Sequence, residues 1–101
     1  MSPEIDAVRT EIDALDAQLV ALIAQRQRWV EAAGRLKSDR DAVRAPDRVE
    51  AVIRKVRALA ETAGADPTVV ERTYRAMIAA FIDLELSVHA GADSRSASAE
   101  G

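Results

Sequence analysis

Residues 8–37 read VRTEIDALDAQLVALIAQRQRWVEAAGRLK, and this stretch decides the fold class. Its apolar residues recur at steps of three and four, which is the spacing of one face of an α-helix. No proline interrupts it, and its only glycine is Gly34. Ser2 and Pro3 supply a cap and a first-turn residue just upstream. The pattern predicts one helix from about Pro3 to Lys37, about 50 Å long at a rise of about 1.5 Å per residue.

The next segment, SDRDAVRA at residues 38–45, is polar and aperiodic, and we expect a loop there. Pro46 is suited to begin a second helix, and Gly64 to end it. Asp66 and Pro67 then form a cap and first-turn pair for a third helix, which we expect to end near His89. The expected core positions are Val49, Val52, Ile53, Val56, Leu59 and Ala63 on the second helix, and Val70, Tyr74, Met77, Ile78, Phe81, Leu84 and Val88 on the third.

These elements make an all-α chain of three helices, which we place in one domain over residues 1–90. The remaining residues, 91–101, read GADSRSASAEG and are small, polar and low in complexity. Such a composition predicts a disordered tail. The second and third helices are each about 30 Å long, so they are too short to cover the whole apolar face of the first. That face must be buried elsewhere. A second copy of the chain is the simplest cover, and we expect an intertwined homodimer.

Composition excludes several classes of function. The formal net charge is -3, whereas nucleic-acid binding requires a basic surface. There is one histidine and no cysteine, which argues against a metal site and against disulfides. The polar N-terminus resembles no secretory leader, and no apolar run approaches the roughly 20 residues that span a bilayer. We therefore expect a cytoplasmic protein that binds neither nucleic acid nor membrane.

Four charged residues fall on or beside the apolar faces when each helix advances 100° per residue. Arg26 and Lys37 point close to the centre of the first helix's apolar face, and Arg9 lies on its flank. Glu85 lies within the apolar face of the third helix. Inward charges are paired, extend their ends to solvent, or serve a function. Arg26 and Lys37, about 16 Å apart along the helix, could hold a small anion with negative groups at both ends.

A structural explanation of the same charges stays open. Glu85 could neutralise Arg26 or Lys37 in a buried salt bridge, while the other cation extends to solvent. Three inward cations against one inward carboxylate leave an excess of positive charge, however. That excess favours a pocket for an anionic ligand.

The sequence resembles the all-helical chorismate mutase family and its sister group, the isochorismate pyruvate lyases. The resemblance lies in the quoted stretch of residues 8–37, in APDRVEAVI at residues 45–53 and, more weakly, in ERTYRAMIAAFIDLEL at residues 71–86. It implies an intertwined dimer of three-helix chains with two active sites, each built from both chains. It also implies a dicarboxylate substrate, chorismate or isochorismate, and no metal or other cofactor.

Site residues follow from the resemblance by position. Arg26 and Lys37 would bind carboxylate and ether oxygens of the substrate, and Arg9 would reach the other carboxylate from the partner chain. Arg48 would help to hold the site. Glu85 stands where most bacterial members have a glutamine that donates a hydrogen bond to the ether oxygen. We assign catalysis to Lys37, Glu85 and Arg26, and expect Glu85 to act in its protonated form.

Three positions depart from the typical mutase pattern. Ala45 and Val49 stand where mutases have carboxylates, the second of which reads the substrate hydroxyl, and Phe81 replaces a small polar residue. These replacements resemble the lyase branch, which converts isochorismate to salicylate and pyruvate, although Glu85 departs from that branch too. The sequence thus predicts a chorismate mutase. An isochorismate pyruvate lyase and a non-catalytic helical dimer remain as alternatives.

Overall fold

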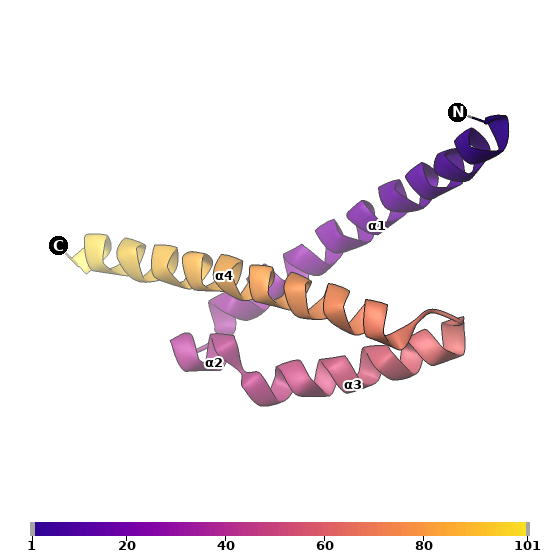
Figure 1. Cartoon of the computed structure of the whole chain (residues 1–101). Helices are drawn as coiled ribbons and strands as arrows, with labels where there is room; N and C mark the ends of the chain where they lie inside the picture. The colour runs from indigo at the N-terminus through magenta and orange to yellow at the C-terminus, as the bar shows by residue number, and fades with distance from the viewer. Residues whose placement is uncertain (1, 101) are drawn as a thin grey trace. The chain divides into compact units, whose positions relative to one another are not determined.

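The computed structural model describes the backbone of residues 2–100 and the side chains of residues 2–88 and 90. Four helices follow one another along the chain, and no strand occurs in residues 2–100 (Figure 1). The all-α prediction is confirmed. The helices are α1 (Pro3–Leu36), α2 (Arg40–Arg44), α3 (Pro46–Ala63) and α4 (Pro67–Glu100).

The chain forms two compact units, Met1–Val30 and Glu31–Gly101. The first contains most of α1. Ser2 caps this helix, because its Oγ accepts a hydrogen bond of 3.2 Å from the Ile5 N–H. Within a single chain, nine large apolar side chains of this unit are exposed, each by at least 40%. They are Ile5, Val8, Ile12, Leu15, Leu19, Val20, Leu22, Ile23 and Trp29.

The second unit begins with the last turns of α1 and then departs from expectation. Residues 38–45 are not a simple loop, because α2 occupies Arg40–Arg44. The carboxylate of Asp39 accepts a hydrogen bond of 2.8 Å from the Ala42 N–H and so caps the short helix. Val43 is only 2% exposed, and α2 contacts α4. Local capping and the burial of this valine together outweigh the polar composition of the segment.

The second long helix, α3, begins at Pro46 as predicted and ends before Gly64, whose φ of 79° closes it in the left-handed conformation. Its buried residues are Ile53, Val56 and Ala60. Leu59 was expected in the core, and this expectation is wrong, because its side chain is 55% exposed. Leu59 lies about 60° around the helix from Val56, beyond the line that faces α4.

The last helix, α4, begins at Pro67 with the predicted cap: Oδ1 of Asp66 accepts hydrogen bonds from the N–H groups of Thr68 and Val69, at 2.8 and 3.2 Å. Its end is Glu100, beyond the His89 at which we expected it. The side chains of His89 and of residues 91–101 lie outside the described part of the chain. The disordered tail predicted for residues 91–101 therefore stays a prediction.

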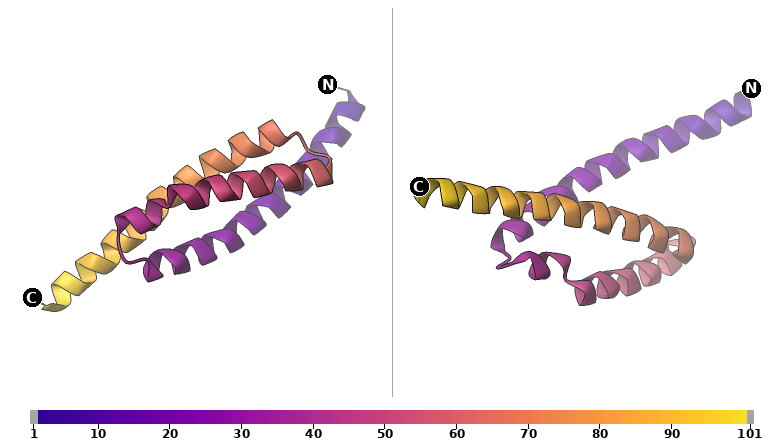
Figure 2. Two further views of the ribbon diagram at one scale, coloured as in Figure 1. Left: turned by 90° about the horizontal axis from the view of Figure 1, so that it is seen from below. Right: turned by 60° about the vertical axis from the view of Figure 1, so that its left-hand side comes forward.

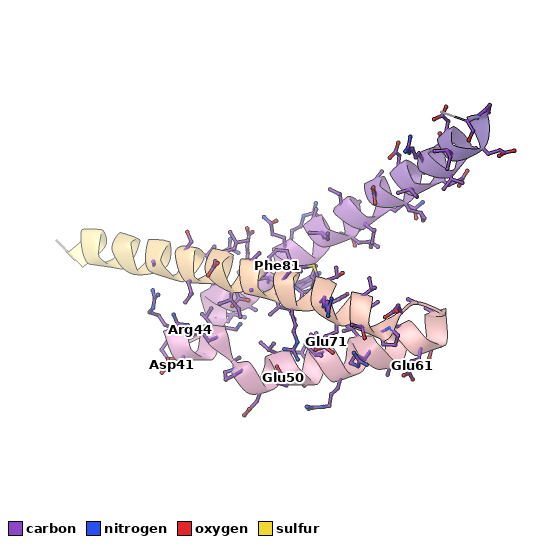
Figure 3. The ribbon with its side chains drawn as sticks, in the orientation of Figure 1. Asp41, Arg44, Glu50, Glu61, Glu71 and Phe81 are labelled. Carbon is purple, nitrogen blue, oxygen red and sulfur yellow. The ribbon has the colours of Figure 1, made fainter. Side chains whose placement is uncertain are left out.

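Helices α3 and α4 run side by side as an antiparallel pair, as both views of Figure 2 show. An ion-pair network, whose two glutamates are labelled in Figure 3, joins them. Arg75 on α4 donates two hydrogen bonds of 2.9 Å to Glu50 on α3. It also donates one of 2.7 Å to Glu71, which accepts a further bond of 2.8 Å from Arg57. Hydrogen bonds from Arg75 hold the pKa of both the Glu50 and the Glu71 carboxyl below the usual range.

Candidate active site

The second unit brings together two of the predicted site residues, Lys37 and Glu85. Nζ of Lys37 lies 2.7 Å from Oε2 of Glu85, a distance typical of a charge-assisted hydrogen bond. The Glu85 side chain is 8% exposed and that of Lys37 is 27% exposed. Glu85 is the only buried charged residue in the described part of the chain. The pair thus lies at the edge of the core, with its cation nearer to solvent.

Local periodicity explains why a carboxylate lies in the core of α4. Ile78, Phe81 and Glu85 are spaced by three and four residues, so they share one face of the helix. All three are buried, and Figure 3 labels Phe81 on α4. The prediction that Glu85 points inward is therefore confirmed. A carboxylate in this position requires a partner, because burying an unpaired charge is very costly.

The partner comes from the end of α1. Lys37 follows the last residue of that helix, and its N–H still donates a hydrogen bond of 3.1 Å to the Ala33 carbonyl. Helical geometry thus extends to Lys37 and holds its Cα in place. The side chain then reaches Glu85, 48 positions further along the chain. Sequence reasoning left open whether Arg26 or Lys37 would pair with Glu85, and the structure shows the pair with Lys37.

The Lys37 ammonium keeps capacity for a further partner. An ammonium group has three N–H donors, and Glu85 accepts from only one of those of Lys37. Oε2 is the oxygen of Glu85 that accepts from Lys37, and no fully buried side-chain oxygen or nitrogen of the described residues lacks a partner. An anionic oxygen placed here could accept from Lys37 and lie beside a carboxyl group.

The other predicted residues of the second unit lie on α3 and α4. Arg48 is exposed on the first turn of α3 and forms no ion pair in the described part of the chain. Val49, the next residue, is half-buried. Phe81 is 9% exposed, one helical turn before Glu85. These positions allow Phe81 a place in the wall of a site around Glu85, whereas the proposed role of Arg48 is untested.

Arg9 and Arg26 lie on α1 in the first unit, where Arg9 is exposed and Arg26 is half-buried. Arg26 and Lys37 therefore belong to different units. The gap that we expect between them for a dicarboxylate, and the reach of Arg9 into a partner chain, stay predictions.

Two features of the second unit were missed by the sequence reasoning. Gly34 packs directly against Glu85, and the bare backbone of a glycine inside a helix was the available signal for such a close approach. The network of Arg75 with Glu50 and Glu71 was also missed. Only its Glu71–Arg75 part, spaced by four residues on one helix, was readable in advance.

The described residues offer no group of three His, Cys, Asp or Glu side chains that could hold a metal ion. Among the same residues, no helix combines the length and apolar character that a membrane span requires.

Comparisons with known proteins agree with the all-α fold. The family model described as chorismate mutase type II matches residues 8–86. An isochorismate pyruvate lyase from Pseudomonas aeruginosa is 33% identical over 75 residues, which are 74% of either chain. The range matched by the family model includes Arg9, Arg26, Lys37 and Glu85. The chain therefore belongs to the chorismate mutase type II family.

Proposed function

We propose that the chain is a chorismate mutase, which rearranges chorismate to prephenate in a cationic pocket around Lys37 and Glu85. The observation that carries the proposal is the 2.7 Å contact between these two side chains at the edge of the core. Membership of the chorismate mutase type II family supports it. No nucleophile, metal or other cofactor is required, because bond making and bond breaking occur within one substrate molecule.

The proposed chemistry depends on positioning and electrostatics. As the ether C–O bond breaks, negative charge develops on its oxygen. Preorganised donors directed at that oxygen stabilise the transition state more than the ground state. Lys37 supplies an ammonium donor. Glu85 supplies a second donor when its carboxyl is protonated, because only the protonated form carries an O–H.

Binding of the two substrate carboxylates is assigned to arginines. Arg26 is placed at one carboxylate and Arg9 of a second copy at the other, since a guanidinium matches a carboxylate in bidentate geometry. Arg48 helps to hold the site, and Val49 and Phe81 form part of its wall. Holding both ends selects the compact substrate conformer, which lowers the barrier by orientation.

The second copy is proposed because most of α1 exposes its apolar side chains within a single chain. Nine large apolar side chains of residues 5–29 are exposed in one chain. Contiguous apolar surface of this kind marks an interaction site. A homodimer in which the α1 helices pack on one another would bury this face and bring Arg9 to the partner's site.

A second candidate function is the lyase reaction, in which isochorismate yields salicylate and pyruvate. The relative from Pseudomonas aeruginosa bears that name at 33% identity. Val49, which stands where mutases read the substrate hydroxyl, also favours this reaction. The same cationic pocket would serve either substrate, so the pair of Lys37 and Glu85 does not choose between them.

The deciding experiment incubates the purified protein separately with chorismate and with isochorismate, and identifies products by chromatography beside an Arg26→Ala control. Prephenate from chorismate, with little salicylate from isochorismate, supports the mutase. Efficient formation of salicylate and pyruvate overturns that assignment in favour of the lyase. If neither substrate yields a product, both reactions are contradicted, and the non-catalytic helical dimer is the remaining alternative.

A further inference from the structure

Gly34 lies two residues before the end of α1 and is buried. A Cβ atom built on it would lie 3.3 Å from Cγ of Glu85, 3.5 Å from its Cβ and 3.7 Å from its Cα. All three neighbours belong to one residue. The bare backbone of α1 is therefore the surface on which the stem of the Glu85 side chain rests.

The same turn of helix carries the partner of that side chain. Lys37 follows Gly34 by three residues, so both lie on one side of the helix. The stem of Glu85 contacts Gly34, and its carboxylate contacts the Lys37 ammonium at 2.7 Å. Glycine is unfavourable inside a helix, and a glycine retained there commonly has a packing reason. The close approach of Glu85 is such a reason.

We propose that Gly34 is a positioning residue: by leaving out a side chain, it sets where the Glu85 carboxyl lies relative to Lys37. Gly34 does not touch substrate and acts only through Glu85. The consequence for catalysis rests on the proposed function, whereas the consequence for the ion pair does not.

An added methyl group would leave little room. With a Cβ at 3.3 Å, Glu85 must move by a few tenths of an ångström or turn its side chain away. Catalytic groups must be held within about 0.5 Å of their productive positions. A displacement of this size therefore matters for a donor directed at a developing charge, although it leaves the carboxylate-binding arginines unchanged.

The catalytic test compares Gly34→Ala with Leu36→Ala, a control on the same turn at a side chain that is 87% exposed. Gly34→Ala should lower kcat about tenfold, since a misplacement of about 1 Å can cost on the order of 100-fold. KM should change less than about threefold, because Arg9 and Arg26 remain. Leu36→Ala should change neither. An unchanged kcat in Gly34→Ala overturns the catalytic part of the proposal.

A second test requires no activity. The coupling between Lys37→Met and Glu85→Gln is measured by urea unfolding as a double-mutant cycle, once in the natural chain and once with Gly34→Ala. The coupling should be present in the first cycle and largely lost in the second. Full coupling in both overturns the proposal. If neither chorismate nor isochorismate reacts with the natural chain, the proposed function fails while this cycle still decides the role of Gly34.

A third variant separates contact with Glu85 from a general packing defect. Glu85→Ala removes the Cγ that lies nearest to the position of the added Cβ. In that background Gly34→Ala should no longer reduce stability and should raise the unfolding midpoint, since alanine is the better helix former. A lowered midpoint in the double variant would show that something other than Glu85 meets the methyl group, which contradicts the proposal.

Discussion

Nζ of Lys37, at the end of α1, lies 2.7 Å from Oε2 of Glu85, which is buried in α4. The contact joins residues 48 positions apart and provides a partner for the only buried charged residue of the described chain. Lys37 is a partly exposed cation, and Glu85 is an acid within the apolar face of α4. Both belong to the range matched by the chorismate mutase type II model.

Removal of the cation should impair both activity and folding. Lys37→Met should lower kcat by about 100-fold or more, as the loss of one preorganised donor commonly does. It should also destabilise the chain by about 1–3 kcal/mol, because Glu85 is left buried without its partner. Lys55→Met changes the chain's other lysine, which is exposed, and is the matched control. Equal activity of the two variants would contradict the assignment of Lys37.

The form of Glu85 that acts in catalysis is testable through pH. If the protonated carboxyl donates to the ether oxygen, kcat/KM should fall as pH rises, because deprotonation removes the O–H. Glu85→Gln keeps an N–H donor at every pH, so its profile should be flatter at alkaline pH. Measurement of kcat/KM for both proteins from pH 5 to pH 9, with controls for the change of buffer, decides this. Flat profiles in both proteins would exclude a titrating donor at this position.

Stability at acid pH should depend on the network around Arg75. The Glu50 and Glu71 carboxyls have pKa values lowered from 4.5, so they favour folding at higher pH. Their contribution is complete above pH 4.5 and is lost as pH falls below it through the folded-state values. The melting temperature of Glu50→Gln should therefore fall less steeply than that of the natural chain between pH 5 and pH 3. Parallel curves would show that the Glu50 carboxyl contributes nothing to the pH dependence of stability. Glu61→Gln, on an exposed residue of α3, is the control.

Backbone strain is concentrated at Ala45, the residue between α2 and α3. Its φ of 35° makes it the only non-glycine residue with positive φ among those described. Ala45→Gly should stabilise the chain by about 1 kcal/mol, because glycine adopts this conformation without a steric penalty. Ala42→Gly, inside α2, should destabilise it by about 0.5–1 kcal/mol. Thermal unfolding at one fixed protein concentration measures both, and changes of the same sign would contradict the argument.

Assembly across chains predicts complementation. Arg9→Ala and Arg26→Ala should each be inactive alone. If Arg9 acts in the partner's site, unfolding and refolding the two together should restore about a quarter of natural activity, since half of the dimers are mixed and each has one intact site. The mixture is assayed beside each variant refolded alone. Without recovery, either the chains do not exchange or Arg9 acts within its own chain; mass analysis of the mixed dimer separates these outcomes.

The sequence by itself determined the class of fold and most helix bounds. Pro3, Pro46 and Pro67 begin helices and Gly64 ends one, because capping and backbone conformation depend on neighbouring residues. The spacing of Ile78, Phe81 and Glu85 likewise placed the acid in the core. The short helix after Lys37 was missed, since its stability comes from the burial of Val43 against other elements rather than from its composition.

Only the tertiary structure decided which groups meet. Sequence periodicity placed both Arg26 and Lys37 inward, and the structure shows Lys37 paired with Glu85. It also showed that Glu85 on α4 packs against Gly34 in the last turns of α1, and that Leu59 is exposed. The physical reason is the same in each instance: a helix pattern fixes the direction of a side chain around its own axis. The partner it reaches depends on the separation and rotation of another helix far away in the sequence.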